Sequence, residues 1–131
     1  MDENIELVRA AYQAYAGGDV ATMLGFVDSN LEWTYLDPSL AHPEPQVCRG
    51  REELELALRR WAENGFRAEL EEVAGTNERV MVGVRTPGLG AYLGRPGEDR
   101  SYAVLTVRDG KIAALRDCHD RTEALRLAGL A

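Results

Sequence analysis

The chain has 131 residues, 45% of them hydrophobic, and its 22 acidic and 15 basic side chains give a formal net charge of −7. This charge argues against nucleic acid and anionic membranes as partners, because both bind basic surfaces. No apolar run approaches the ~20 residues that span a bilayer, and the N-terminal segment lacks a signal peptide's basic and apolar regions. We therefore expect one cytoplasmic domain, residues 1–131, able to bury a core of its own.

Two helices are predicted at the start of the chain. Apolar residues recur at helical spacing from Ile5 to Tyr15. The first helix should end at Gly17-Gly18, where glycine adopts the left-handed conformation of a helix C-terminus. Asp19 is then a suitable N-cap for a short second helix.

Strands dominate the rest of the chain. A strand is predicted over 31–36, followed by a loop over 38–49, whose three prolines disfavour regular structure, and by a helix over 51–64. The glycine-rich run 88–94 lacks the dinucleotide-binding fingerprint and predicts a hairpin loop at a pocket rim or a dimer edge. The remaining elements are strands over 66–74, 79–86, 100–108 and 111–119, and a final helix to residue 128 that Asp120 and Glu123 cap.

The last strand carries the most information about function. Asp109-Gly110 is a strong two-residue hairpin signal, so the following residues should form a returning strand. Alternation along that strand places Leu115, Asp117 and His119 on one face. If this face is covered, a carboxylate and an imidazole point into an apolar interior. Their burial costs folding free energy unless they are paired, hydrogen-bonded or part of a functional site.

The order of the elements predicts an α+β fold with helices on one face of an antiparallel sheet. The segments 11–20, 26–33, 50–54 and 109–112, together with residues 116–117, resemble nuclear transport factor 2-like (NTF2-like) domains, in particular the SnoaL-like, polyketide cyclase-like branch. This resemblance implies a cone-shaped, curved antiparallel sheet, a partial barrel with the N-terminal helices on its concave face. It also implies a pocket for a small molecule and a homodimer through the outer sheet face.

Two enzymes of this superfamily offer closer comparisons. The resemblance to limonene epoxide hydrolase places an acidic residue on the last strand, at Asp117, and an arginine and an aspartate on an earlier strand, at Arg79 and Met81. Because Met81 replaces the aspartate, epoxide hydrolysis is not expected. The comparison with ketosteroid isomerase puts Tyr35 at the general base and Ala11 at the oxyanion tyrosine, so an unmodified isomerase site is absent.

The candidate catalytic residues are Asp117, His119 and Tyr35. Asp117 and His119 would act as base or acid, with Tyr35 and Tyr102 as hydrogen-bond donors. In the alternative interpretation, Asp117 forms a structural ion pair with Arg79 or Arg100 and His119 is a partly exposed histidine. The candidate pocket-binding residues are Trp33, Tyr15, Trp61, Arg79, Met81 and Tyr102.

Two functional hypotheses follow from these residues. The first is a cofactor-independent enzyme of isomerase, cyclase or hydrolase type that performs acid/base chemistry on a small, apolar, oxygenated substrate. The second is a non-catalytic ligand-binding or dimer-scaffold protein of the same fold. No cofactor and no metal are expected, because the two histidines are far apart in the chain and no acidic cluster accompanies them.

Overall fold

The structure is a computed structural model that describes residues 2–37, 42–76 and 78–130. Among these residues, no helix is both long enough and apolar enough to cross a membrane. The elements are α1 (Asp2–Ala16), α2 (Val20–Leu24), β1 (Val27–Tyr35), β2 (Gln46–Arg49), α3 (Arg51–Glu63), β3 (Glu69–Thr76), β4 (Arg79–Arg85), α4 (Leu89–Tyr92), β5 (Arg100–Arg108), β6 (Lys111–Cys118) and α5 (Arg121–Leu127).

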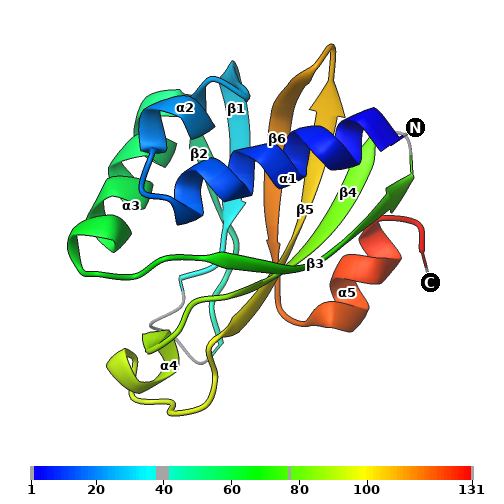
Figure 1. The fold of residues 1–131 in the computed structure, drawn as a ribbon. Coiled ribbons are helices and arrows are strands. Elements are labelled where there is room, and N and C mark those ends of the chain that lie inside the picture. The colour runs from blue at the N-terminus through cyan, green and yellow to red at the C-terminus, as the bar shows by residue number, and fades with distance from the viewer. Residues whose placement is uncertain (1, 38–41, 77, 131) are drawn as a thin grey trace.

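The six strands form one curved sheet in the order β2-β1-β6-β5-β4-β3 (Figure 1). This arrangement, with helices packed on the sheet, confirms the predicted α+β class and NTF2-like cone. All neighbouring strands pair antiparallel except β1 and β6, which are parallel, with Trp33 opposite Leu115 and Thr34 opposite Arg116. Because this pair is parallel, the C-terminal ends of β1 and β6 lie at the same end of the sheet.

One predicted loop contains a strand. The described part of the proline-rich stretch 38–49 ends in β2, which pairs with β1 and places Cys48 opposite Trp33; residues 38–41 lie outside the described residues. The last proline, Pro45, directly precedes the four-residue strand, so no proline interrupts its ladder. A second difference is α4, a single helical turn within the glycine-rich segment.

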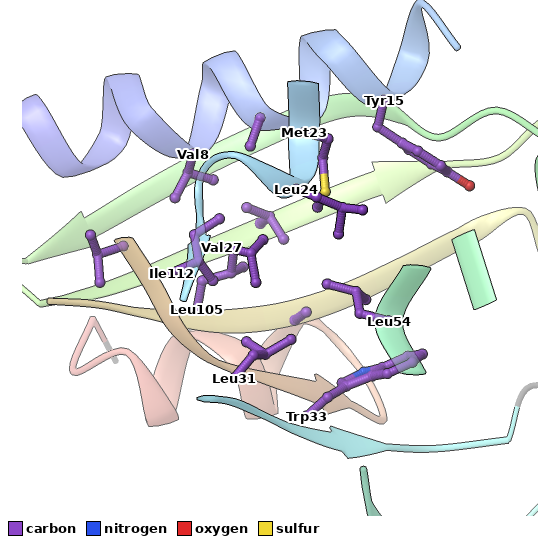
Figure 2. Close-up of a cluster of buried hydrophobic side chains, with 14 of the residues drawn as sticks. Val8, Tyr15, Met23, Leu24, Val27, Leu31, Trp33, Leu54, Leu105 and Ile112 are labelled. Carbon is purple, nitrogen blue, oxygen red and sulfur yellow. The ribbon is translucent and has the colours of Figure 1, made fainter. Parts of the chain in front are cut away.

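The main core lies between the concave face and the helices α1, α2 and α3 (Figure 2). Val8 of α1, Leu31 of β1 and Ile112 of β6 are all at most 2% exposed. Each such side chain contributes about 1.5–3 kcal/mol by leaving water. Figure 2 shows Trp33 beside Leu54, at the same end of the cluster as Tyr15.

A second, smaller core lies on the outer face of the sheet, under α5. Met81 and Val104 pack there against Ala124 and Ala128 of the helix. The predicted cap is present, since Asp120 accepts a hydrogen bond from the Glu123 N–H. α5 therefore covers part of the outer face, the surface expected to form a homodimer, and the dimer stays a prediction.

Candidate functional site

A cavity of about 780 Å³ lies between the concave face and α1 and α3. This volume is within the usual range for small-molecule sites, about 300–1,000 Å³. Its walls are mostly apolar, with Leu58 and Trp61 from α3 and Val82 and Val84 from β4. Alternation on β4 presents its even-numbered valines to the concave side, so this strand contributes no charge to the wall.

Asp117 brings a carboxylate to the wall of this cavity. Its Oδ1 accepts a hydrogen bond from Trp33 Nε1 at 3.1 Å, and its Oδ2 accepts one from the Leu36 N–H at 3.0 Å. Leu36 follows the last residue of β1, where the sheet pairing ends, so its N–H is available to a side chain. Burial raises the pKa of Asp117, and the hydrogen bonds from Leu36 and Trp33 oppose that rise.

The structural ion pair considered for Asp117 is not formed. Arg100 pairs with Glu71 at 2.8 Å, and Arg79 donates to the carbonyl oxygen of Leu127. None of the ion pairs among the described residues includes Asp117. The carboxylate is therefore held by two N–H donors and not by a cation.

Two tyrosines of the cavity wall are affected by the charge of Asp117. Burial raises the pKa of Tyr35 to about 12, and the charges of Asp37 and Asp117 add to this rise. Burial also raises the pKa of Tyr12, again with a contribution from Asp117. Both rings line the cavity, so at neutral pH they present protonated hydroxyls that can donate hydrogen bonds to a ligand.

Tyr12 lines the cavity, although it is not among the pocket residues predicted from the sequence. It lies on the packed face of α1 together with Val8 and Tyr15, and helical spacing alone does not distinguish a core tyrosine from one that lines a cavity. The predicted pocket residues Tyr15, Trp33 and Trp61 do line the cavity.

His119 lies at the rim and is engaged elsewhere. It follows the end of β6, and its side chain is 51% exposed. Its Nδ1 is 3.2 Å from Glu123 Oε1, and its backbone N–H donates to the same oxygen. The ring borders the cavity, but its hydrogen-bonding partner is the first turn of α5.

Three other expected pocket residues have side chains on the outer face. In the β4–β5 register, Met81 is opposite Val104 and Gly83 is opposite Tyr102. Met81 is fully buried under α5, and Arg79 reaches the end of that helix. The Tyr102 ring packs over Gly83, where a Cβ would lie 3.1 Å from it, although the residue borders the cavity. The expected placement of Arg79 and Met81 is therefore corrected, because the even-numbered positions of β4 face the cavity, whereas Tyr102 borders the cavity as expected.

The described residues contain no group of three or more His, Cys, Asp or Glu side chains placed to hold a metal ion. The cavity wall combines a larger apolar surface with tyrosine hydroxyls and with charged residues, which include Asp117, Arg100 and the Arg95–Glu98 ion pair. Such a surface suits an organic ligand that carries a few oxygen atoms.

The curved sheet, the helices on its concave face and the cavity between them define an NTF2-like domain. The sequence profile of the SnoaL-like domain matches residues 8–115, and the chain belongs to this family. A comparison with curated proteins gives no significant match.

Solved structures share the fold at low identity. Bal32a, from a soil-derived mobile gene cassette, is 24% identical with a TM-score of 0.70, covering 97% of this chain and 96% of that one. A candidate polyketide cyclase from Sinorhizobium meliloti is 16% identical with a TM-score of 0.67, over 86% and 94%. TerC, co-crystallised with polyporic acid, is 20% identical with a TM-score of 0.63, over 96% and 97%. At these identities the likeness shows the fold alone.

Proposed function

We propose that the protein binds a small, mostly apolar, oxygenated molecule in the cavity and that Asp117 transfers a proton to or from it. The observation that carries this proposal is a cation-free carboxylate held by Trp33 and Leu36 at the wall of an apolar cavity. A structural carboxylate in such a place is normally paired with a cation. Two structural neighbours support a ligand of this class: a candidate polyketide cyclase, and TerC, which was co-crystallised with polyporic acid.

The proposed chemistry needs no cofactor. A carboxylate whose pKa is raised by burial is a better base near neutral pH than an ordinary aspartate. It would take a proton from carbon next to a carbonyl group, and the hydroxyl of Tyr35 or Tyr12 would donate a hydrogen bond to the oxyanion that develops. His119 is a weaker candidate for this step, because Glu123 holds its ring at the rim.

The second candidate is ligand binding without chemistry. Its support is that both oxygens of Asp117 already accept hydrogen bonds that join the end of β1 to β6, so the carboxylate has a structural use. In this case the cavity and its tyrosines would select the ligand, and the bound molecule would leave unchanged.

A pair of bicyclic probes separates these two functions. 2-Naphthol tests binding, because its emission differs between the neutral and the anionic form. 2-Tetralone tests chemistry, because it carries acidic C–H groups next to a carbonyl, and its exchange of protons for deuterium is followed by NMR. Asp117→Asn keeps the shape of the side chain but not its basicity. Asp109→Asn, the same change in the exposed hairpin turn at the other end of β6, is the matched control.

We expect the native protein and Asp109→Asn to bind 2-naphthol and to speed deuterium exchange into 2-tetralone. Asp117→Asn should still bind 2-naphthol, but exchange should fall by about 100-fold or more, the usual contribution of a general base. Binding without exchange in the native protein would favour the second candidate. Equal exchange rates in Asp117→Asn and the native protein would refute the role of Asp117.

A further inference from the structure

We propose that residues 86–99, between β4 and β5, form a preformed lid that closes the cavity over its ligand and that the contact between Tyr92 and Phe66 holds it shut. This segment contains α4, which projects beyond the end of the sheet (Figure 1). The inference that a ligand is enclosed rests on the proposed function; the movement of the lid does not.

The two ends of the lid, Thr86 and Asp99, are hydrogen-bonded to each other and form a narrow neck. The Thr86 N–H donates to the carbonyl oxygen of Asp99 at 2.9 Å. The Asp99 carboxylate accepts hydrogen bonds from the N–H groups of Gly88 and Gly90, the second at 2.8 Å. Farther along, the Arg95 N–H donates to the Gly90 carbonyl at 2.7 Å. All of these bonds join residues of the same segment.

Gly90 shows how tightly the lid is packed internally. A Cβ at this position would lie 2.4 Å from the Arg95 carbonyl oxygen and 2.7 Å from the Glu98 nitrogen, so no larger residue fits without a shift of the backbone. Arg95 and Glu98 also form an ion pair at 2.9 Å within the segment. A segment with this much internal bonding moves as one body about its neck more readily than it unravels.

The inner side of the lid belongs to the cavity. Leu89, the first residue of α4, and Leu93, which directly follows its last residue, both line the cavity. These two leucines extend the apolar lining of the cavity, to which Trp61, near the end of α3, also belongs. A closed lid therefore adds two leucines and the charged pair Arg95–Glu98 to the enclosure of a ligand and limits the ligand's length.

The outer attachment of the lid is a small aromatic contact. The rings of Tyr92 and Phe66 meet edge to face with centroids 5.0 Å apart, and Phe66 meets Trp61 in the same way at 5.7 Å. Phe66 is 8% exposed, whereas Tyr92 is 62% exposed. Because most of the tyrosine already lies in water, this side chain loses little beyond the ring contact when the lid opens.

A thiol placed deep in the cavity tests the lid without any ligand. Ala103 is a 9% exposed residue of β5 that lines the cavity, and Ala103→Cys is a small change there. Its modification by iodoacetamide is followed by peptide mass spectrometry, which separates it from the native Cys48 and Cys118. In this background, Tyr92→Ala removes the ring contact and Tyr92→Phe is the matched control that keeps it.

We expect Tyr92→Ala to speed modification by about threefold to tenfold, the factor that corresponds to one lost aromatic pair, and Tyr92→Phe to leave the rate unchanged. The Gly90 and Arg95 amides should stay protected from hydrogen exchange in Tyr92→Ala, because the lid moves as a unit. Equal modification rates, or loss of this amide protection, would refute the proposal.

The ligand-bound state gives the second measurement. Without the Ala103→Cys change, Tyr92→Ala should raise the dissociation rate of 2-naphthol by about the same factor, measured by stopped-flow fluorescence. An unchanged dissociation rate would refute the closing of the lid over a ligand. Failure of the native protein to bind 2-naphthol, together with faster thiol modification in Tyr92→Ala, would refute the proposed ligand class and uphold the lid.

Discussion

Replacing Trp33 with phenylalanine should raise the pKa of Asp117 further. The substitution removes the Nε1–H group that donates to Asp117 Oδ1 and leaves the bond from the Leu36 N–H in place. A hydrogen bond to a charged group is worth about 1.5–3 kcal/mol, and the lower value suits a site that is open to solvent on one side. Since one pKa unit corresponds to about 1.4 kcal/mol, the expected rise is about one unit.

NMR titration of the Asp117 carboxyl carbon measures this change. The matched control is Trp61→Phe, because Trp61 lines the same cavity and makes no hydrogen bond to the carboxylate in the described structure. The native protein should titrate above the usual value of 3.8. Trp61→Phe should titrate close to the native protein, and Trp33→Phe about one unit higher. Equal midpoints in the two variants would refute the role of the indole.

The sign of the accompanying stability change follows from proton linkage. Because burial raises the pKa of Asp117, the folded chain holds a proton that the unfolded chain has lost between the usual and the raised pKa. The contribution of Asp117 to the free energy of unfolding therefore falls as pH rises through this window and is constant above it. Urea denaturation should show the fall extending to higher pH in Trp33→Phe.

Two further substitutions test the outer face of the sheet. Met81→Ala should lower the free energy of unfolding, measured in urea, by about 2–5 kcal/mol, because the side chain is fully buried under α5. The affinity for 2-naphthol should stay unchanged, and a weaker affinity would indicate that Met81 faces the cavity. Glu72→Gln should cost a small amount of stability, because Glu72 pairs with Arg121 of α5 at 2.6 Å on a solvent-exposed surface. The hydrogen bond from Arg121 lowers the pKa of Glu72. The native protein should therefore be more stable than Glu72→Gln above pH 4.5, and the difference in stability should disappear as pH falls through the lowered pKa. A difference that persists in strong acid would show that the ion pair is not its cause.

The hairpin turn and the helix cap could be predicted from the sequence, because each is determined by a few neighbouring residues. Asp109 and Gly110 both adopt positive φ, as a two-residue hairpin requires, and the strands on either side pair as expected. The cap by Asp120 is equally local. β2 was missed because an edge strand of four residues after a proline shows too little alternation to be recognised.

The site depended on register, which local patterns do not determine. Alternation placed Asp117 and Leu115 on the same face of β6, and the structure places both at the cavity wall. On β4, every residue from Val80 to Val84 is buried, so burial does not distinguish one face from the other there. Only the helices that pack on each side decide that Met81 faces outward, and a one-residue shift in this assignment reverses every side chain of the strand.

The two N–H groups that hold Asp117 also limit what the carboxylate can do. An ionised carboxylate accepts about four hydrogen bonds, and the bonds from Trp33 and Leu36 use one position on each oxygen. Among the described residues, the remaining positions are available to a ligand, and the orientation of the group is already set by its two bonds to the end of β1. A base that is oriented before the ligand arrives needs no reorganisation during proton transfer, which is the arrangement that favours catalysis. The same bonds join β1 to β6, so a loss of activity in Asp117→Asn is informative only beside its stability, whereas Trp33→Phe changes the pKa and keeps the carboxylate itself.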